Sequence, residues 1–229
     1  MTAVVRFPAN TRGRDFIVGD IHGMFPMLKG ALTALNFNEE ADRLFSVGDL
    51  VDRGPDSAAA KQWCAYPWFH AVRGNHEEMC LTARSDLHLL NGGEWFLKLD
   101  AEEQESFREL FRSLPFAIEI EDTNGAVDIG IVHADPVFDY WPDLIAALES
   151  ENKSSQLAAL WSRAKIDNID ITAISGVGLV VCGHTVTTGS TLLGNTLYID
   201  TGACFGMSLT LYEPAVDTCH TFLVNGAPT

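Results

Sequence analysis

The stretch "FIVGDIHG" at residues 16–23 joins a short apolar run to a polar cluster. Short runs rich in Val, Ile and Phe that are closed by glycine are typical of strands buried on both faces of a sheet. Asp20 and His22 are two residues apart, so they could form an ordinary turn or half of a metal site. Gly19 and Gly23 would let the backbone turn closely around an ion. The choice depends on whether the rest of the chain supplies further ligands.

Four later segments repeat this pattern of an apolar run that stops at polar residues. They are "LFSVGD" at 44–49, "FHAVRGNHE" at 69–77, "DIGIVHAD" at 128–135 and "GLVVCGHT" at 178–185. A helical pattern at 27–35 has Pro26 in its first turn, so the first half of the chain reads β-α-β-α-β. After residue 190, the runs "TLYIDTG", "MSLTLYEP" and "CHTFLVNG" alternate with turns and predict a hairpin-rich sheet.

The composition is that of a globular protein, with 229 residues of which 47% are hydrophobic and 20% charged. We therefore expect a single domain over 1–229, with its motif-bearing core at about 15–206. The segment at about 83–115, which contains "NGGEW" and an acidic helical pattern, is expected to be a variable helical insertion between sheet strands.

Charge, cysteines and hydropathy limit the partners and the compartment. A formal net charge of -16 argues against binding to nucleic acid or to an anionic membrane. The five cysteines include no C-x-x-C pair, which predicts reduced thiols rather than disulfides or a thiolate zinc site. No apolar run approaches the roughly 18 residues of a membrane helix and no signal peptide is apparent, which predicts a cytoplasmic protein.

The polar clusters should converge, because the loops at the carboxyl ends of parallel strands meet at one edge of a sheet. Six metal donors from five loops are too many for one open catalytic ion and about right for two ions that share a carboxylate. Such a pair is the usual clamp for phosphate ester hydrolysis, and arginines beside it would pair bidentately with phosphate. The converging set is Asp20, His22, Asp49, Asp52, Arg53, Arg73, Asn75, His76, Glu77, His133 and His184.

Five motifs in order resemble those of the metallophosphoesterases of the serine/threonine phosphoprotein phosphatase type. These motifs are "GDIHG" (19–23), "GDLVDRG" (48–54), "RGNHE" (73–77), "VHAD" (132–135) and "CGHT" (182–185). The stretches "LWSRAKI" at 160–166 and "YIDTGACFG" at 198–206 look closest to the bacterial and bacteriophage (lambda phosphatase-like) members. The resemblance implies an α/β, calcineurin-like fold in which two mixed β-sheets pack as a sandwich flanked by helices.

The resemblance also implies a ligand set for two divalent metal ions. The implied ligands are Asp20 and His22 for one ion, Asn75, His133 and His184 for the other, and Asp49 as the bridge. Mn²⁺ is the first expectation, with Fe, Zn, Ni or Mg as alternatives, because these nitrogen and oxygen donors accept several ions.

The remaining motif residues are implied to act on the substrate. His76 would be the general acid that protonates the leaving oxygen, and Asp52 would accept the other ring proton of His76. Arg53 and Arg163 would hold the phosphoryl oxygens, with Arg73 as a third. Attack would be direct and in line, by a hydroxide bound to both metals and without a phosphoenzyme intermediate.

The predicted function is a metal-dependent phosphomonoester hydrolase, foremost a protein serine/threonine phosphatase that could also accept phosphotyrosine or small phosphoesters. Its partners would be phosphorylated proteins or small phosphoesters, and a monomer is the default. One alternative is a symmetrical diadenosine tetraphosphatase, although that family usually carries "GNHD" and "HAG" where this chain has "GNHE" and "HAD". A remote alternative is a catalytically silent metal-binding module, against which the complete ligand set argues.

Other residues near the motifs have simpler interpretations. Glu77 is expected to cap or support the next helix rather than to bind metal. Trp95 and Trp161 are expected to serve packing. His88 and His220 fall outside every motif and are expected to be surface or core histidines. The "W-x-R" match that includes Arg163 is short, so an ordinary helix-surface arginine is the alternative there.

Overall fold

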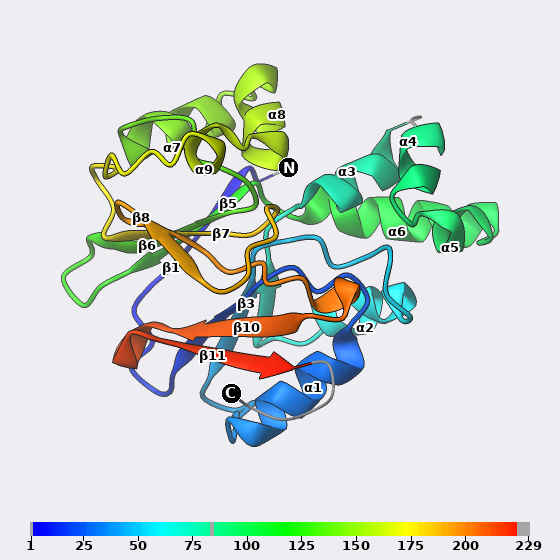
Figure 1. The fold of residues 1–229 in the computed structure, drawn as a ribbon, viewed down its shortest axis with the longest axis horizontal. Helices are drawn as coiled ribbons and strands as arrows, with labels where there is room; N and C mark the ends of the chain where they lie inside the picture. The colour runs from blue at the N-terminus through cyan, green and yellow to red at the C-terminus, as the bar shows by residue number, and fades with distance from the viewer. Residues whose placement is uncertain (1, 83–84, 224–229) are drawn as a thin grey trace.

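The computed structural model describes residues 2–82 and 85–223. Within these residues the strands form two mixed sheets that pack face to face, with helices on their outer sides (Figure 1). The predicted fold class, a sandwich of two mixed sheets flanked by helices, is confirmed. The expectation of one domain over 1–229 stays a prediction.

The five-stranded sheet has the order β11-β10-β2-β3-β4. Its strands are β2 (Asp15–Val18), β3 (Arg43–Ser46), β4 (Phe69–Ala71), β10 (Ser208–Glu213) and β11 (Thr218–Leu223). β2, β3 and β4 are parallel and are connected through α1 (Phe25–Ala34) and α2 (Ala60–Cys64), which confirms the predicted β-α-β-α-β unit. Pro26 lies in the first turn of α1, where its missing N–H costs nothing.

The six-stranded sheet has the order β1-β5-β6-β7-β9-β8. Its strands are β1 (Val4–Phe7), β5 (Ala117–Glu121), β6 (Val127–Val132), β7 (Leu179–Cys182), β8 (Thr191–Leu193) and β9 (Thr196–Tyr198). The β8–β9 and β10–β11 hairpins confirm the hairpin-rich end of the chain, although residues 224–226 of the last predicted run lie outside the described residues. The parallel strands β6, β7 and β9 place their carboxyl ends at the same edge.

Apolar side chains from both sheets fill the space between them, as expected for a sandwich. Ile17 and Phe45 of one sheet meet Ile131 and Val181 of the other in one buried cluster. A second cluster lies under α1 and α2, and a third lies under α7 (Trp141–Glu149) and α8 (Lys153–Trp161). The short helix α9 (Ala164–Asp167) follows α8.

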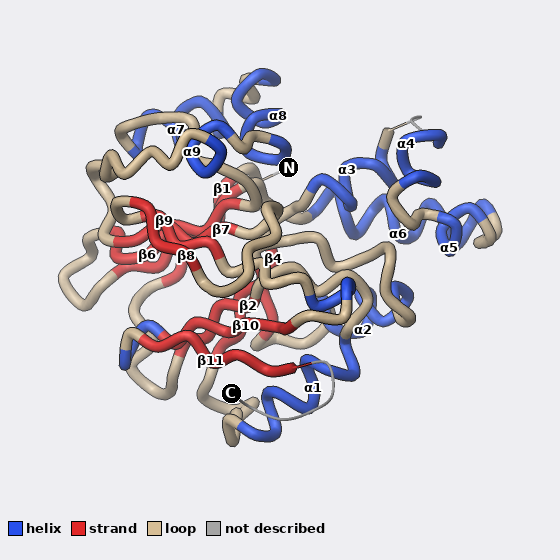
Figure 2. The backbone as a smooth tube through the Cα atoms, in the orientation of Figure 1, coloured by secondary structure: helices blue, strands red, loops and turns tan. Residues whose placement is uncertain are grey.

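The predicted insertion forms helices that project to one side of the sandwich, as Figures 1 and 2 show. It comprises α4 (Ser85–Leu90), α5 (Glu94–Leu97) and α6 (Ala101–Ser113), and α6 packs on α3 (Asn75–Leu81). The segment connects β4 of one sheet to β5 of the other, and its residues 83–84 are not among those described. Across the described ranges, no helix is long and apolar enough to cross a membrane.

Candidate active site

The structure brings the predicted ligand residues together at the carboxyl ends of the parallel strands. All six side chains are buried. They are Asp20 and His22 after β2, Asp49 after β3, Asn75 at the start of α3, His133 after β6 and His184 after β7. Three of these residues adopt positive φ angles that are uncommon for residues other than glycine: 45° at His22, 49° at Asp49 and 64° at His184. Such backbone strain is typical of functional sites.

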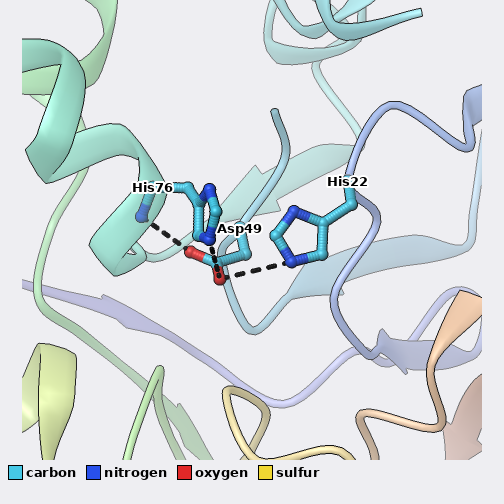
Figure 3. Close-up of side chains that lie close together, drawn as sticks. All are labelled: His22, Asp49 and His76. Carbon is cyan, nitrogen blue, oxygen red and sulfur yellow. Dashed lines mark hydrogen bonds and ion pairs between the residues drawn. The ribbon is translucent and has the colours of Figure 1, made fainter. Parts of the chain in front are cut away.

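Asp49 lies at the centre of this cluster, with its two carboxylate oxygens directed at different neighbours. Oδ2 is 3.5 Å from Nε2 of His22 and 3.8 Å from Nε2 of His76, as Figure 3 shows. Oδ1 is 3.4 Å from Nε2 of His133. Two groups of potential metal ligands therefore share Asp49, one with His22 and His76 and the other with His133 and His184.

On one side of Asp49, acceptor atoms face one another. Nδ1 of His133 lies 2.8 Å from the carbonyl oxygen of Val47 and must donate to it, so Nε2 of the neutral ring carries no proton. That Nε2 nevertheless lies 2.9 Å from Oδ1 of Asn75, and Nδ1 of His184 lies 2.8 Å from the same oxygen. The lone pairs of His133 Nε2 and Asn75 Oδ1 converge in this way and fit a cation between them.

The protonation states of His133 and His184 also support a cation site on this side of Asp49. Burial lowers the pKa of His133 and lowers the pKa of His184 to about 3, so both rings are neutral at pH 7. Nε2 of His184 is buried and has no hydrogen-bond partner among residues 2–82 and 85–223. Neutral imidazoles with free lone pairs are the form that binds metal.

The other side of Asp49 holds the Asp20 and His22 pair. Nδ1 of His22 donates to the carbonyl oxygen of Val51 at 2.8 Å, and Nη1 of Arg53 donates to Nε2 of His22 at 2.6 Å. Burial lowers the pKa of His22 to about 3. The unprotonated Nε2 lies 4.0 Å from Oδ2 of Asp20. The Nε2 lone pair and the Asp20 carboxylate therefore lie close to one another, and an ion held by both would take the place of the Arg53 contact on Nε2.

Asp200 is a further buried carboxylate in this cluster that the sequence motifs did not single out. Burial raises the pKa of Asp200 to about 6, and the Asp49 charge adds to this rise. Burial, together with the charges of Asp200 and Asp49, also raises the pKa of Asp20 well above its ordinary value. Carboxylates concentrated in a buried site repel one another, and a divalent cation would relieve this repulsion. The signal was present in "YIDTG" (198–202), where another apolar run ends in aspartate.

His76 and Asp52 form a close pair beside the ligands. Nδ1 of His76 lies 2.6 Å from Oδ2 of Asp52, and both side chains are buried. Burial would raise the pKa of Asp52, but the hydrogen bonds from His76 and His88 outweigh it and hold that pKa below its usual range. Asp52 is therefore ionised and accepts the Nδ1 proton, which leaves Nε2 of His76 directed at the Asp49 side of the site.

Two residues of the insertion also reach Asp52, which the sequence analysis did not foresee. His88 is a core histidine, within the range expected, yet its Nε2 lies 3.0 Å from both oxygens of Asp52. Trp95 does more than pack, because its Nε1 donates to Oδ1 of Asp52 at 2.6 Å. The motif "NGGEW" (91–95) was the available signal, since paired glycines next to a tryptophan indicate a close approach of backbones.

The three predicted phosphate-binding arginines lie in different surroundings. Arg53 is exposed beside His22, and Arg163 is exposed where its Nη2 lies 3.4 Å from the carbonyl oxygen of His184. Arg73 is buried, and its guanidinium donates to Glu78 and to the carbonyl oxygens of Arg112 and Leu114 at the end of α6. These contacts favour a structural role for Arg73, and its phosphate-binding role stays a prediction.

Glu77 supports the loops of the site, which confirms the expectation that it caps the next helix. Its carboxylate accepts hydrogen bonds from three backbone N–H groups: Gly74 at 2.8 Å, Asp49 at 3.0 Å and Leu50 at 2.8 Å. The first is part of the capping box of α3. The other two tie the loop that carries Asp49 to that helix.

The chain belongs to the calcineurin-like phosphoesterase family, whose sequence pattern its residues 16–187 match. It is 40% identical over 214 residues to serine/threonine-protein phosphatase 1 of Salmonella typhimurium, which covers 90% of this chain and 94% of the relative. It is 36% identical over 208 residues to serine/threonine-protein phosphatase 2 of Escherichia coli, covering 86% and 91%. A symmetrical bis(5'-nucleosyl)-tetraphosphatase of Hamiltonella defensa is 37% identical over 78 residues, 33% of this chain and 25% of the relative.

Solved structures support the same fold. A putative diadenosine tetraphosphatase superposes over 100% of this chain and 98% of its own, with a TM-score of 0.64 and 22% identity. A protein serine/threonine phosphatase from Saccharomyces cerevisiae has a TM-score of 0.68 and 16% identity, covering 93% of this chain and 77% of its own. At these identities the likeness concerns the fold alone.

Proposed function

We propose that this chain is a metal-dependent phosphomonoester hydrolase that acts on phosphoserine and phosphothreonine in proteins. The observation that carries the proposal is the pair of buried ligand groups that share Asp49. The similarity to two bacterial serine/threonine-protein phosphatases over most of the chain supports protein substrates.

The buried residues on the two sides of Asp49 are proposed to hold two divalent ions. Asp20 and His22 would hold one ion, Asn75, His133 and His184 would hold the other, and Asp49 would contact both. When bound, such ions lower the pKa of a water and provide positive charge for the phosphate oxygens. We propose Mn²⁺ as the ion, because a mixed set of carboxylate, carboxamide and imidazole donors suits first-row divalent ions.

The side chains around the ligands would handle the proton and the phosphate. His76 would donate its Nε2 proton to the leaving oxygen, and Asp52 would stabilise the imidazolium through Nδ1. Arg53 and Arg163 would pair with the phosphoryl oxygens from opposite sides of the ligand cluster, since one lies beside His22 and the other beside His184.

Removal of the metals is expected to abolish hydrolysis. We expect the purified protein to release phosphate from p-nitrophenyl phosphate with Mn²⁺, to lose this activity with a chelator, and to regain it when Mn²⁺ is added back. The buried carboxylates of the ligand cluster repel one another, and bound Mn²⁺ would relieve this repulsion. The melting temperature of the protein should therefore rise when Mn²⁺ is added. Release of phosphate that is insensitive to chelation would contradict the proposal.

Symmetrical cleavage of diadenosine tetraphosphate is the second candidate function. The partial match to the bis(5'-nucleosyl)-tetraphosphatase favours it. The two candidates are separated by initial rates on phosphoserine, phosphothreonine and phosphotyrosine peptides and on diadenosine tetraphosphate under one set of Mn²⁺ conditions. A higher kcat/KM for the dinucleotide than for every peptide would favour the second candidate.

Replacing Arg163 with alanine is expected to weaken phosphate binding about tenfold, because a charge-assisted guanidinium contact contributes about 1.5–3 kcal/mol. Competitive inhibition by inorganic phosphate gives the measurement. Arg12→Ala is the matched control, since Arg12 is also exposed and its backbone N–H donates to Asn10 in the loop before β2. If phosphate inhibits the Arg163→Ala variant as well as the parent, Arg163 does not contact the phosphate.

A further inference from the structure

The helical insertion reaches into the active site through one short turn. This turn, residues 91–95, follows α4 and includes the first two residues of α5. Its first residue, Asn91, accepts a hydrogen bond from Nη2 of Arg53 at 3.3 Å, and its last residue, Trp95, donates to Asp52 at 2.6 Å. The insertion therefore contacts both a proposed phosphate-binding arginine and the partner of the proposed general acid.

Glycines make this approach possible. A Cβ atom at Gly92 would lie 2.6 Å from the backbone nitrogen of Arg53, and Gly92 has a φ of +91°. A Cβ atom at Gly93 would lie 2.1 Å from the ring of His88. Any side chain at either position would push the turn away from Arg53 or displace His88.

The insertion and His76 together occupy most of the acceptor capacity of Asp52. Trp95 donates to Oδ1 at 2.6 Å, His76 donates to Oδ2 at 2.6 Å, and Nε2 of His88 lies 3.0 Å from both oxygens. A carboxylate can only accept, so each of these ring nitrogens is a donor. The backbone N–H of Asp52 is also held, by Oγ of Ser57 at 2.8 Å.

These contacts fix the rotation of the carboxylate. Oδ2 faces His76 in this orientation of the carboxylate plane, and the contacts from Trp95 and His88 hold the same orientation. If the indole N–H were removed, Oδ1 would lose one of its two short contacts and the buried carboxylate would turn to recover solvation or another donor. The His76 ring would then lose its alignment.

The alternative of a third metal site at this position does not fit. Asp52, Cys80 and His88 lie close enough to form a ligand group. However, burial raises the pKa of the Cys80 thiol, so the thiol stays protonated, and the proton on Nε2 of His88 is committed to Asp52. The group is therefore satisfied by hydrogen bonds rather than by an ion.

We propose that Trp95 and His88 are positioning residues for general-acid catalysis, which hold the Asp52 carboxylate so that it orients His76 toward the leaving oxygen. This inference rests on the proposed phosphatase function. It assigns the helical insertion a part in the chemical step, beyond any contact with the polypeptide substrate.

The test compares two substrates that differ in how much they need the acid. The leaving group of a phosphoserine peptide is the serine alkoxide, which must be protonated. The leaving group of p-nitrophenyl phosphate is p-nitrophenolate, which is stable without a proton. For the Mn²⁺-loaded Trp95→Phe variant, which loses only the N–H group and part of the ring, we expect the fall in kcat on the peptide to exceed the fall on the aryl ester about tenfold. KM for the peptide should change less than about twofold, because the substrate contacts remain.

Variants of His88 provide an independent second arm, should Trp95→Phe fold poorly. His88→Leu should show the same substrate-dependent loss, whereas His88→Gln, whose side-chain amide can still donate to Asp52, should retain most of the peptide activity. Trp68→Phe is the matched control, because Trp68 stacks on Tyr66 under α1 and should leave the ratio of the two activities unchanged.

The outcomes distinguish a failure of the positioning role of Trp95 and His88 from a failure of the proposed phosphatase function. Equal losses on both substrates, or no loss on either, in an active parent would overturn the positioning role and leave the phosphatase standing. Failure of the parent itself to hydrolyse both substrates with Mn²⁺ would overturn the proposed function and the inference with it.

Discussion

Replacing His76 with asparagine is expected to lower kcat on a phosphoserine peptide by about 10²–10⁴-fold, because it removes the proposed proton donor to the leaving oxygen. The amide nitrogen of asparagine can occupy the place of Nδ1 and keep the hydrogen bond to Asp52. The backbone N–H of residue 76 would still donate to Oδ1 of Asp49, which lies 3.0 Å away. Steady-state kinetics and metal analysis of the same preparation provide the two measurements.

The metal content of the His76→Asn variant decides what the lost activity means. We expect it to equal that of the parent, and we expect a smaller loss on p-nitrophenyl phosphate than on the peptide. His220→Asn is the matched control, since His220 lies in β11 and contacts Glu213 away from the site. Loss of bound metal in the His76→Asn variant would instead make His76 a ligand, as its place in one of the two potential ligand groups allows.

Replacing Asp49 with asparagine is expected to lower activity on every phosphoester by about 10³-fold or more, because it removes the charge that both ions are proposed to share. Burial would raise the pKa of Asp49, yet that pKa lies below its usual range, helped by the backbone N–H of His76 that donates to Oδ1 at 3.0 Å, so the parent site presents a full negative charge. Metal analysis should show a fall from two ions per chain toward one or none.

The control for the Asp49 variant is Glu40→Gln, which removes one exposed negative charge in the turn between α1 and β3. It should keep both ions and full activity. An Asp49→Asn protein that retains two tightly bound ions would show that Asp49 does not link them, and it would require another bridging group, for which the buried carboxylate of Asp200 is a candidate.

The parts of the fold that were predictable from sequence share one physical cause. Strands β2, β3, β6 and β7 are buried on both faces over most of their length, so each reads as a short apolar run. β5 escaped prediction because its segment "AIEIE" carries two charges. One of these, Glu119, is buried but paired with Arg6 at 2.7 Å and with the indole of Trp141 at 2.8 Å. Such pairing across the fold cannot be seen in the local pattern.

In the site, too, features of the local sequence were predictable, whereas contacts that depend on the tertiary fold were not. The convergence of Asp20, Asp49 and His133 was predictable because each follows a parallel strand, and parallel strands align their carboxyl ends. The contacts of His88 and Trp95 with Asp52 were not, because they depend on how the insertion folds back across 36 and 43 residues of chain. The paired glycines at 92–93 are the only local trace of that close approach among the described residues of the insertion.

A crystal structure of the protein grown with Mn²⁺, with anomalous scattering measured at the manganese edge, tests the central claim most directly. The account predicts two anomalous peaks about 3.5–4 Å apart, one on each side of the Asp49 carboxylate. One peak should lie beside Asp20 and His22, and the other beside Asn75, His133 and His184. A single peak, or two peaks that do not share Asp49, would contradict the account.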